Sequence, residues 1–364
     1  MTDRLTNLFI ELLKVTVGTR VSLSSEPSEK EWAALFALSR RQAIAAAVLD
    51  GVGRLPEAQR PPQSVLLQWC AVGAMTEDRN AEVNRAATDL TAKVGAAGFD
   101  SCILKGQGVA LYYPNPLSRQ CGDIDIWLGG GDKRVIEYVR SLAPKTKAIY
   151  HHIEAPQFDG VEVEVHYRPS YFRSPFTNRR LQKWAGEQFP AQVAHKVILP
   201  GQSAEVSVPT KEFNLIYILL HIYTHFFQEG IGLRQMMDYY YVLMSGITPA
   251  QKEEAVRVIK EFRMTRFASA VMYVLQQVFG LSEDYFLVPA DSRDGEILLE
   301  EIMRVGNFGQ YDPRNIKKRG HSALYKGWMN ILRDLQYIRM SPSEVLWLPY
   351  FKIWHLFWRR AHNN

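Results

Sequence analysis

The chain has few cysteines, little net charge and no long apolar run, and each of these absences narrows what it can be. Its three cysteines, Cys70, Cys102 and Cys121, lie far apart and cannot all pair, which favours ordinary thiols in a reducing compartment. The longest apolar runs fall short of the roughly 18 residues that a membrane-spanning helix needs. The net charge of +5 is compatible with an anionic substrate but is too scattered to indicate nucleic-acid binding. We therefore expect a cytoplasmic protein without a transmembrane segment or a nucleic-acid partner.

The spacing of apolar residues divides the 364 residues into three regions. Residues 1–98 are rich in helix formers with apolar positions three or four apart, and Gly98 is a plausible helix stop. Residues 99–205 contain short apolar runs with a period of two, and residues 206–364 return to helical spacing. The sequence thus predicts an α+β fold, in which a mixed β-sheet core is flanked by N-terminal and C-terminal helical regions.

The stretch LSRQCGDIDIWL, residues 117–128, contains two carboxylates, Asp123 and Asp125, within an alternating run. A strand would point both side chains to the same side, where like charges repel unless a cation joins them. Such a D-x-D pair occurs by accident about once in a chain of this size, so its context decides its meaning.

A second alternating segment, VEVEVH at residues 161–166, supplies that context. Val161, Val163 and Val165 share one face, which is typical of a core, while Glu162, Glu164 and His166 share the other. If this strand lies beside GDIDIWL, several carboxylate oxygens converge, and magnesium prefers such hard oxygen ligands. Without the aspartates, the glutamates would be interpreted as the solvated face of an amphipathic strand.

Cationic candidates precede the aspartates. Lys105 and Gly106 follow a predicted strand, where a turn without a side chain lets phosphate oxygens approach and the lysine offers a point charge. Arg119, four residues before Asp123, is a third candidate. The simpler interpretations are an ordinary turn and a surface arginine.

These segments together resemble a known family. ILKGQGVALYY, RQCGDIDIWL and VEVEVH, followed by helices with LLHIYTHFF and GLRQMMDYYYVL, resemble the uncharacterised bacterial nucleotidyltransferase-like family of the DNA polymerase beta-like superfamily, over about residues 30–310. The resemblance implies a nucleotidyltransferase-type sheet and catalysis with two Mg²⁺ ions. It assigns the metal aspartates to Asp123 and Asp125, the third carboxylate to Glu164, the phosphate turn to Lys105 and Gly106, and a following histidine to His166.

The chain departs from the superfamily pattern in two places. The serine expected after the turn glycine is absent, because Gln107 follows Gly106. The third carboxylate is Glu164, one methylene longer than aspartate, and Glu162 on the same predicted face could take its place.

The expected activity is transfer of a nucleoside monophosphate from a nucleoside triphosphate to a hydroxyl of an acceptor, with pyrophosphate leaving. A small molecule or glycan is favoured over a protein as the acceptor. Two alternatives stay open: a nucleotide-binding module without turnover, which the missing serine favours, and a D-x-D glycosyltransferase that uses a nucleotide sugar and does not require Glu164.

Two pairs of residues on the predicted later helices have simpler interpretations. His221 and His225 are four apart and share a face, but they lack a third ligand and are expected to be hydrogen-bonded core residues. Arg234 and Asp238 are also four apart, and we expect them to pair with each other.

The tail contains Trp347, Phe351, Trp354 and Trp358 at helical spacing, followed by two arginines. This pattern could lie in a membrane interface, which would make the protein peripherally membrane-associated. We expect instead that residues 343–360 dock on the body of the protein, since the run is short and contains a proline.

Overall fold

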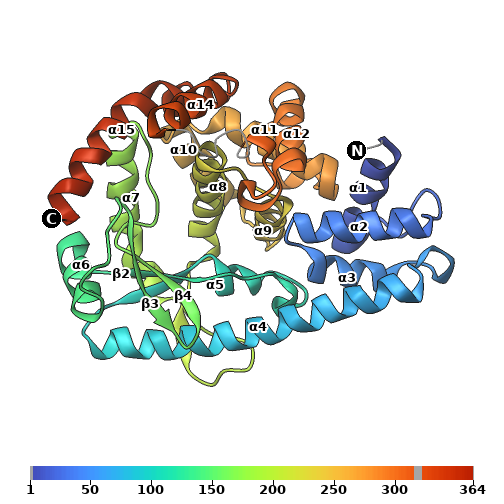
Figure 1. The fold of residues 1–364 in the computed structure, drawn as a ribbon, viewed down its shortest axis with the longest axis horizontal. Coiled ribbons are helices and arrows are strands. Elements are labelled where there is room, and N and C mark those ends of the chain that lie inside the picture. The colour runs from blue at the N-terminus through green and yellow to red at the C-terminus, as the bar shows by residue number, and fades with distance from the viewer. Residues whose placement is uncertain (1–2, 315–321, 364) are drawn as a thin grey trace.

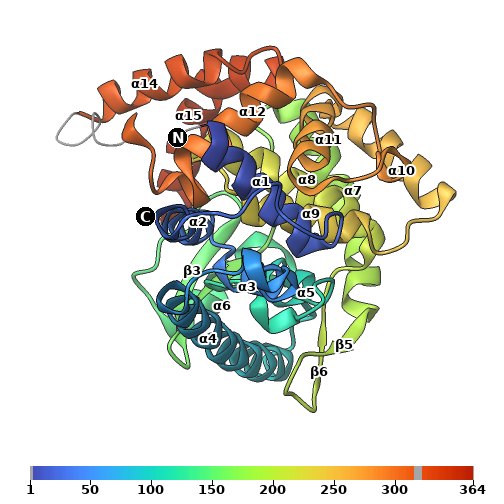
Figure 2. The same cartoon turned by 90° about the vertical axis from the view of Figure 1, so that its right-hand side faces the viewer.

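The structure is a computed structural model that describes residues 3–314 and 322–363. A small four-stranded sheet lies against one long helix, and the remaining helices lie above and beside it (Figures 1 and 2). The α+β fold with helical regions before and after the sheet is therefore confirmed.

The N-terminal region is helical. Ser28 begins α2 with a capping box, in which Ser28 accepts a hydrogen bond from the Glu31 N–H and the Glu31 side chain accepts one from the Ser28 N–H. The long α4 runs beneath the sheet (Figure 1) and ends just before Gly98, whose φ of +80° fits the helix stop expected there. The helices of this region are α1 (Asp3–Val17), α2 (Glu29–Arg41), α3 (Ala45–Arg54), η1 (Glu57–Gln59) and α4 (Gln63–Ala96).

The sheet has the strand order β1-β2-β4-β3, with β2 and β4 parallel and the other pairs antiparallel. The condition set for the site in the sequence, that VEVEVH lies beside GDIDIWL, is therefore met. The strands are β1 (Ser101–Leu104), β2 (Ile124–Leu128), β3 (His152–Phe158) and β4 (Val161–His166), and the helices between them are α5 (Gly106–Ala110), η2 (Pro116–Ser118) and α6 (Gly131–Leu142).

Strands β3 and β4 form a hairpin. Its two-residue turn is Asp159–Gly160, both with positive φ, as the favoured hairpin turns require. The three valines of β4 are buried, in agreement with the face predicted from the alternation.

One helix and two short strands between the sheet and the later helices were not predicted. Helix α7 (Pro175–Ala194) has few buried apolar side chains, so its period is weak in the sequence. Its start carries a signal that could have revealed it, because Ser174 caps the helix and Pro175 occupies the first turn. The short strands β5 (Lys196–Ile198) and β6 (Glu205–Ser207) form a separate two-stranded sheet.

The predicted return to helices is confirmed. Helix α8 is apolar on nearly every side and lies in the centre of the largest core cluster, which also includes side chains of α1 and α11. The N-terminal and C-terminal helices thus share one core. The elements are α8 (Lys211–Gln228), α9 (Leu233–Leu243), α10 (Pro249–Glu261), α11 (Thr265–Phe279), η3 (Glu283–Tyr285), α12 (Ser292–Val305), η4 (Asn307–Gly309), α14 (Ala323–Leu335) and α15 (Pro342–Asn363).

The C-terminal helix α15 docks on the protein, as expected (Figure 1). Phe351 stacks on Tyr171, Trp354 and Trp358 meet Tyr150 edge-on, and Arg140 of α6 donates to the carbonyl of His362. The opposite face of α15 exposes apolar side chains, among them Leu346, Ile353 and Phe357. No described helix has the length and apolar character needed to cross a membrane.

Candidate active site

Asp123 and Asp125 line one cavity of about 250 Å³. Asp125 is in β2 and only 5% exposed, whereas Asp123 immediately precedes the strand. The rest of the lining comes from the β1–α5 turn, the loop before β2, β4, α8 and the residue after it, α9 and η4. The lining residues are Lys105, Gly106, Arg119, Gly122, Glu164, His221, His225, Glu229, Arg234, Gln235, Asp238 and Phe308.

Glu164 is brought to the aspartates by the parallel pairing of β2 and β4. It is the register partner of Asp125, and its side chain is 32% exposed on the cavity wall. Glu162, two residues earlier, is exposed and does not line this cavity. The geometry thus distinguishes two glutamates that the sequence pattern placed on the same face.

His166 lies between the two carboxylates. Its Nε2 atom is 2.8 Å from Asp125 Oδ1 and 3.4 Å from Glu164 Oε2, and the residue is 2% exposed. Burial alone would lower the pKa of His166, but the hydrogen bonds to Asp125 and Glu164 outweigh it and raise the pKa. The histidine therefore contributes directly to the charge balance of the site.

Lys105 projects into the site from an unusual turn. It precedes α5 with φ +52° and ψ −128°, a conformation that costs a non-glycine residue roughly 1–3 kcal/mol. Its Nζ atom lies 2.7 Å from Asp125 Oδ1. A Cβ on the neighbouring Gly106 would lie 3.9 Å from the carbonyl oxygen of Asp123, which is ordinary van der Waals contact between the turn and the aspartate segment.

The pKa values of the two aspartates are shifted in opposite directions. The negative charge of Asp125 and then burial raise the pKa of Asp123 to about 6. Burial would also raise the pKa of Asp125, but Lys105 and His166 outweigh it and hold that pKa well below its ordinary value. For Glu164, burial is likewise outweighed, mainly by the His166 hydrogen bond, and the pKa is lowered.

Arg119 lines the cavity but is paired. Its Nε and Nη2 atoms donate to the two carboxylate oxygens of Asp238 at 2.7 and 2.8 Å, and the Tyr113 hydroxyl donates to the same carboxylate. Such a bidentate buried pair fixes the segment before the aspartates against α9. A contact between Arg119 and nucleotide remains a prediction.

The expected pair between Arg234 and Asp238 is wrong, because Asp238 is held by Arg119 instead. Arg234 donates from Nη1 to the carbonyl of Gln120, and its guanidinium lies 5.1 Å from the Phe308 ring centroid. Its Nε is buried and has no hydrogen-bond partner among the described residues. Arg234 is therefore a cavity-lining cation, a role that its helical spacing from Asp238 did not suggest.

His221 and His225 also line the cavity and are half-buried, so the expectation that they are core residues is corrected. Their rings are 4.2 Å apart, and the Nδ1 atom of His225 is 2.6 Å from a carboxylate oxygen of Glu229. No sequence pattern pointed to Glu229, Gln235 or Phe308, because tertiary packing brings these residues to the cavity.

Two groups of potential metal ligands occur in the described part of the chain. Asp125, Glu164 and His166 offer one atom each within 4.8 Å of one another, and so do His151, His152 and His166. The first group has the two carboxylates and one imidazole that a divalent cation can use. In the sequence, the adjacent histidines His151 and His152 could have indicated the second group.

The chain is similar to proteins described as nucleotidyltransferases or nucleotidyltransferase-like. The model of a family described as uncharacterised nucleotidyltransferase matches residues 28–280, which is more than half of the chain. A crystal structure of an antigenic nucleotidyltransferase-like protein from Paracoccidioides brasiliensis is 16% identical, covering 59% of this chain and 97% of that one with a TM-score of 0.35. No curated protein matches the chain.

Proposed function

We propose that this chain, which belongs to the uncharacterised nucleotidyltransferase family, transfers a nucleoside monophosphate from a nucleoside triphosphate to a hydroxyl of an acceptor. The observation that carries the proposal is the register pairing of Asp125 with Glu164, which joins the two carboxylates in one cavity with Asp123 and Lys105. The assignment to the DNA polymerase beta-like superfamily is part of this proposal.

The donor set fits a divalent metal ion, since Asp125, Glu164 and His166 offer ligand atoms within 4.8 Å of one another and Asp123 lines the same cavity. We propose Asp123, Asp125 and Glu164 as ligands of two Mg²⁺ ions. When bound, magnesium would neutralise phosphate charge and orient the triphosphate.

The reaction would form a bond between the acceptor oxygen and the α-phosphorus and break the bond from that phosphorus to the pyrophosphate oxygen. Lys105 carries the positive charge that would bind phosphate oxygens, exchanging its contact with Asp125 for them. Glu164, partly exposed on the cavity wall, is the candidate to accept the hydroxyl proton. The contribution of the protein is mainly positioning and charge neutralisation.

A cavity of about 250 Å³ is smaller than the roughly 300–1,000 Å³ of sites that enclose a whole small molecule. We infer that it accommodates the phosphates, while the nucleoside and the acceptor extend beyond it. We further propose a small molecule or glycan as the acceptor. We also propose a location in the cytoplasm, because the three cysteines are free thiols and thiols persist in a reducing compartment.

Nucleotide binding without turnover is the second candidate, because Lys105 and His166 already hold Asp125 Oδ1. The D-x-D glycosyltransferase alternative gives Glu164 no role. Incubation of the purified chain with each α-³²P-labelled nucleoside triphosphate, Mg²⁺ and a cell extract should yield a labelled acceptor and pyrophosphate. Magnesium-dependent binding without either product would support the non-catalytic candidate, and transfer of sugar from a nucleotide sugar would support the glycosyltransferase.

Arg234 provides a test of phosphate binding. Its buried Nε has no described partner, so it can donate a charge-assisted hydrogen bond to a phosphate, worth about 1.5–3 kcal/mol. We expect Arg234→Gln to weaken triphosphate binding by roughly 10- to 100-fold, measured by calorimetry with Mg²⁺. Binding of the corresponding nucleoside should not change.

The matched control is Arg293→Gln, which alters an exposed arginine of α12 outside the cavity and should bind like the wild type. Equal triphosphate affinity in Arg234→Gln and the wild type would remove Arg234 from the binding site. Equal losses for nucleoside and triphosphate would indicate that Arg234 acts only by holding the loop through Gln120.

A further inference from the structure

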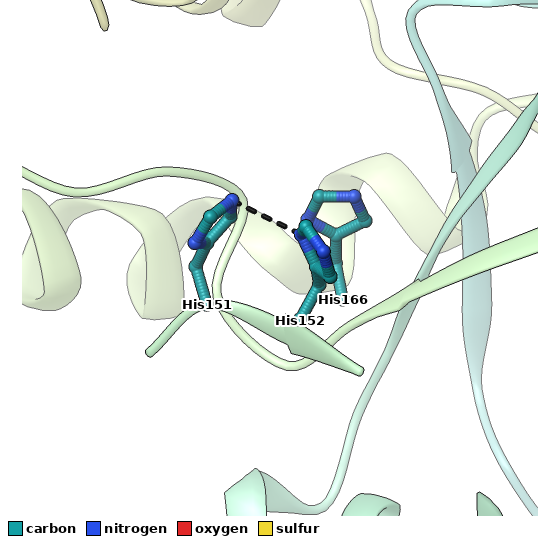
Figure 3. A group of neighbouring side chains, drawn as sticks. All are labelled: His151, His152 and His166. Atoms are coloured by element: carbon teal, nitrogen blue, oxygen red, sulfur yellow. Dashed lines mark hydrogen bonds between the residues drawn. The ribbon is translucent and has the colours of Figure 1, made fainter. Parts of the chain in front are cut away.

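A cluster of three histidines lies at the end of the sheet hairpin (Figure 3). It is beside the carboxylates, since His166 contacts Asp125 and Glu164. His152 opens β3 and His166 closes β4, and the two are direct register partners in the antiparallel ladder. Directly opposed residues project from the same face of a sheet, so their rings come together, 5.1 Å apart between centroids. The hairpin register therefore forms half of the cluster.

His151 joins the cluster although it neighbours His152 in the chain. Successive strand residues point to opposite faces, but β3 begins only at His152, so His151 is free of that alternation. Its Nε2 atom lies 3.1 Å from Nδ1 of His152, as the dashed line in Figure 3 shows. One ring nitrogen from each of the three histidines lies within 4.8 Å of the other two.

The cluster is enclosed and not fully hydrogen-bonded. His152 and His166 are 8% and 2% exposed, and Nδ1 of His151 is buried without a hydrogen-bond partner in the described part of the chain. Figure 3 shows that this nitrogen points away from the other two rings, so the atoms available to hold an ion are the one nitrogen from each ring that converge within 4.8 Å. Imidazole nitrogens are ligands that zinc and related ions commonly take in proteins.

A carboxylate completes the set. Oε2 of Glu164 is 3.4 Å from Nδ1 of His152 and 3.4 Å from Nε2 of His166. Three imidazoles and a carboxylate are a donor set that zinc and its neighbours in the first transition row accept, whereas Mg²⁺ prefers oxygen ligands and keeps its waters.

We propose that His151, His152 and His166 bind one transition-metal ion of the zinc class, with Glu164 as its carboxylate ligand. This site is additional to the proposed Mg²⁺ ligands Asp123 and Asp125, and the two sites would share Glu164. It does not depend on nucleotidyl transfer, because it concerns metal binding by the chain alone.

The test uses full-length protein stripped with a chelator and titrated with Co²⁺, whose visible absorption reports nitrogen ligation, and then with Zn²⁺ by calorimetry. We expect one equivalent to bind, with no displacement by millimolar Mg²⁺. His152→Ala and His151→Ala should each weaken binding at least tenfold, because even the loss of a group that only supports a metal ligand typically costs about 10- to 100-fold in affinity. His355→Ala, a histidine of α15 outside the cluster, is the matched control.

Asp123→Asn separates this site from the proposed magnesium site, since it should leave the Co²⁺ spectrum unchanged. Loss of the spectrum in Asp123→Asn with retention in both histidine variants would overturn the proposal by locating the ion at the aspartates. Displacement by Mg²⁺, or wild-type affinity in both histidine variants, would also overturn it. Circular dichroism without metal checks folding, and His151→Ala, a change at a residue outside the strand, keeps the test valid if His152→Ala does not fold.

Discussion

Replacing Asp125 with asparagine is expected to abolish transfer and to destabilise the metal-free protein, whereas Asp123→Asn should abolish transfer and stabilise it. Each change removes a proposed Mg²⁺ ligand, so product should fall below detection in both variants. The difference lies in the apo protein. Asp125 accepts from Lys105 and His166, both largely buried, while Asp123 mainly experiences repulsion from Asp125.

The size of each stability effect follows from these contacts. Breaking a buried ion pair costs roughly 3–5 kcal/mol. Asp123 and Glu164 remain near Lys105 as weaker partners, so about 2 kcal/mol is expected for Asp125→Asn. Asp123→Asn relieves a repulsion that raises the pKa from 3.8 to about 6. After allowance for the partial exposure of Asp123, a gain on the order of 1–2 kcal/mol is expected at pH 7.

The stability difference between Asp123→Asn and the wild type should depend on pH in a predictable direction. The pKa of Asp123 is higher in the folded protein than in the unfolded chain, so the folded state holds the proton longer. The contribution of Asp123 to the free energy of unfolding is therefore most favourable below pH 4, and it is lost as the pH rises through about 6. The advantage of Asp123→Asn over the wild type should grow between pH 4 and 7.

Urea unfolding in EDTA-containing buffer at several pH values, for the wild type and both variants, measures these differences. Considered from the sequence alone, both replacements would be expected to leave the fold intact or slightly stabler, because only repulsion between the aspartates is visible there. A destabilised Asp123→Asn variant, or a stabilised Asp125→Asn variant, would contradict the charge balance described for Lys105.

The local patterns of the sequence predicted the sheet well and its surroundings less well. Alternation assigns residues to faces, so the buried valines of β4 could be predicted. Helix α7 was missed because it buries few apolar side chains, which leaves little periodicity to detect. The order of strands in a sheet depends on contacts between distant segments, which local patterns do not reveal. The site prediction therefore had to assume that β2 and β4 are neighbours.

The same limit applies to the site. Asp123, Asp125, Lys105 and Glu164 were predicted from motifs and do meet in one cavity. Helical spacing predicted the wrong partner for Asp238, since Arg119 from a distant loop binds both of its carboxylate oxygens, which the residue one helical turn away does not do. His151 was missed because its position depends on where a strand begins, which sequence patterns define poorly.

Glu164→Gln is expected to reduce transfer by roughly 10²- to 10⁴-fold through loss of the proposed base alone, with a further loss from weaker metal binding. The change keeps the size of the side chain and its hydrogen-bonding shape but removes the charge beside Asp125. Triphosphate binding should survive, because Lys105 and Arg234 remain in the cavity. This result would separate nucleotidyl transfer from the glycosyltransferase alternative, which has no role for Glu164.

Glu162→Gln is the matched control, since it makes the same change on the same strand at an exposed position outside the cavity. Pyrophosphate release in extract and nucleotide affinity by calorimetry would be measured for the wild type and both variants. Equal turnover in the wild type and Glu164→Gln would refute the assignment of the third carboxylate. Loss in Glu162→Gln alone would transfer that role to Glu162 and would require β4 to pair with β2 two residues out of the observed register, because only such a shift brings Glu162 opposite Asp125.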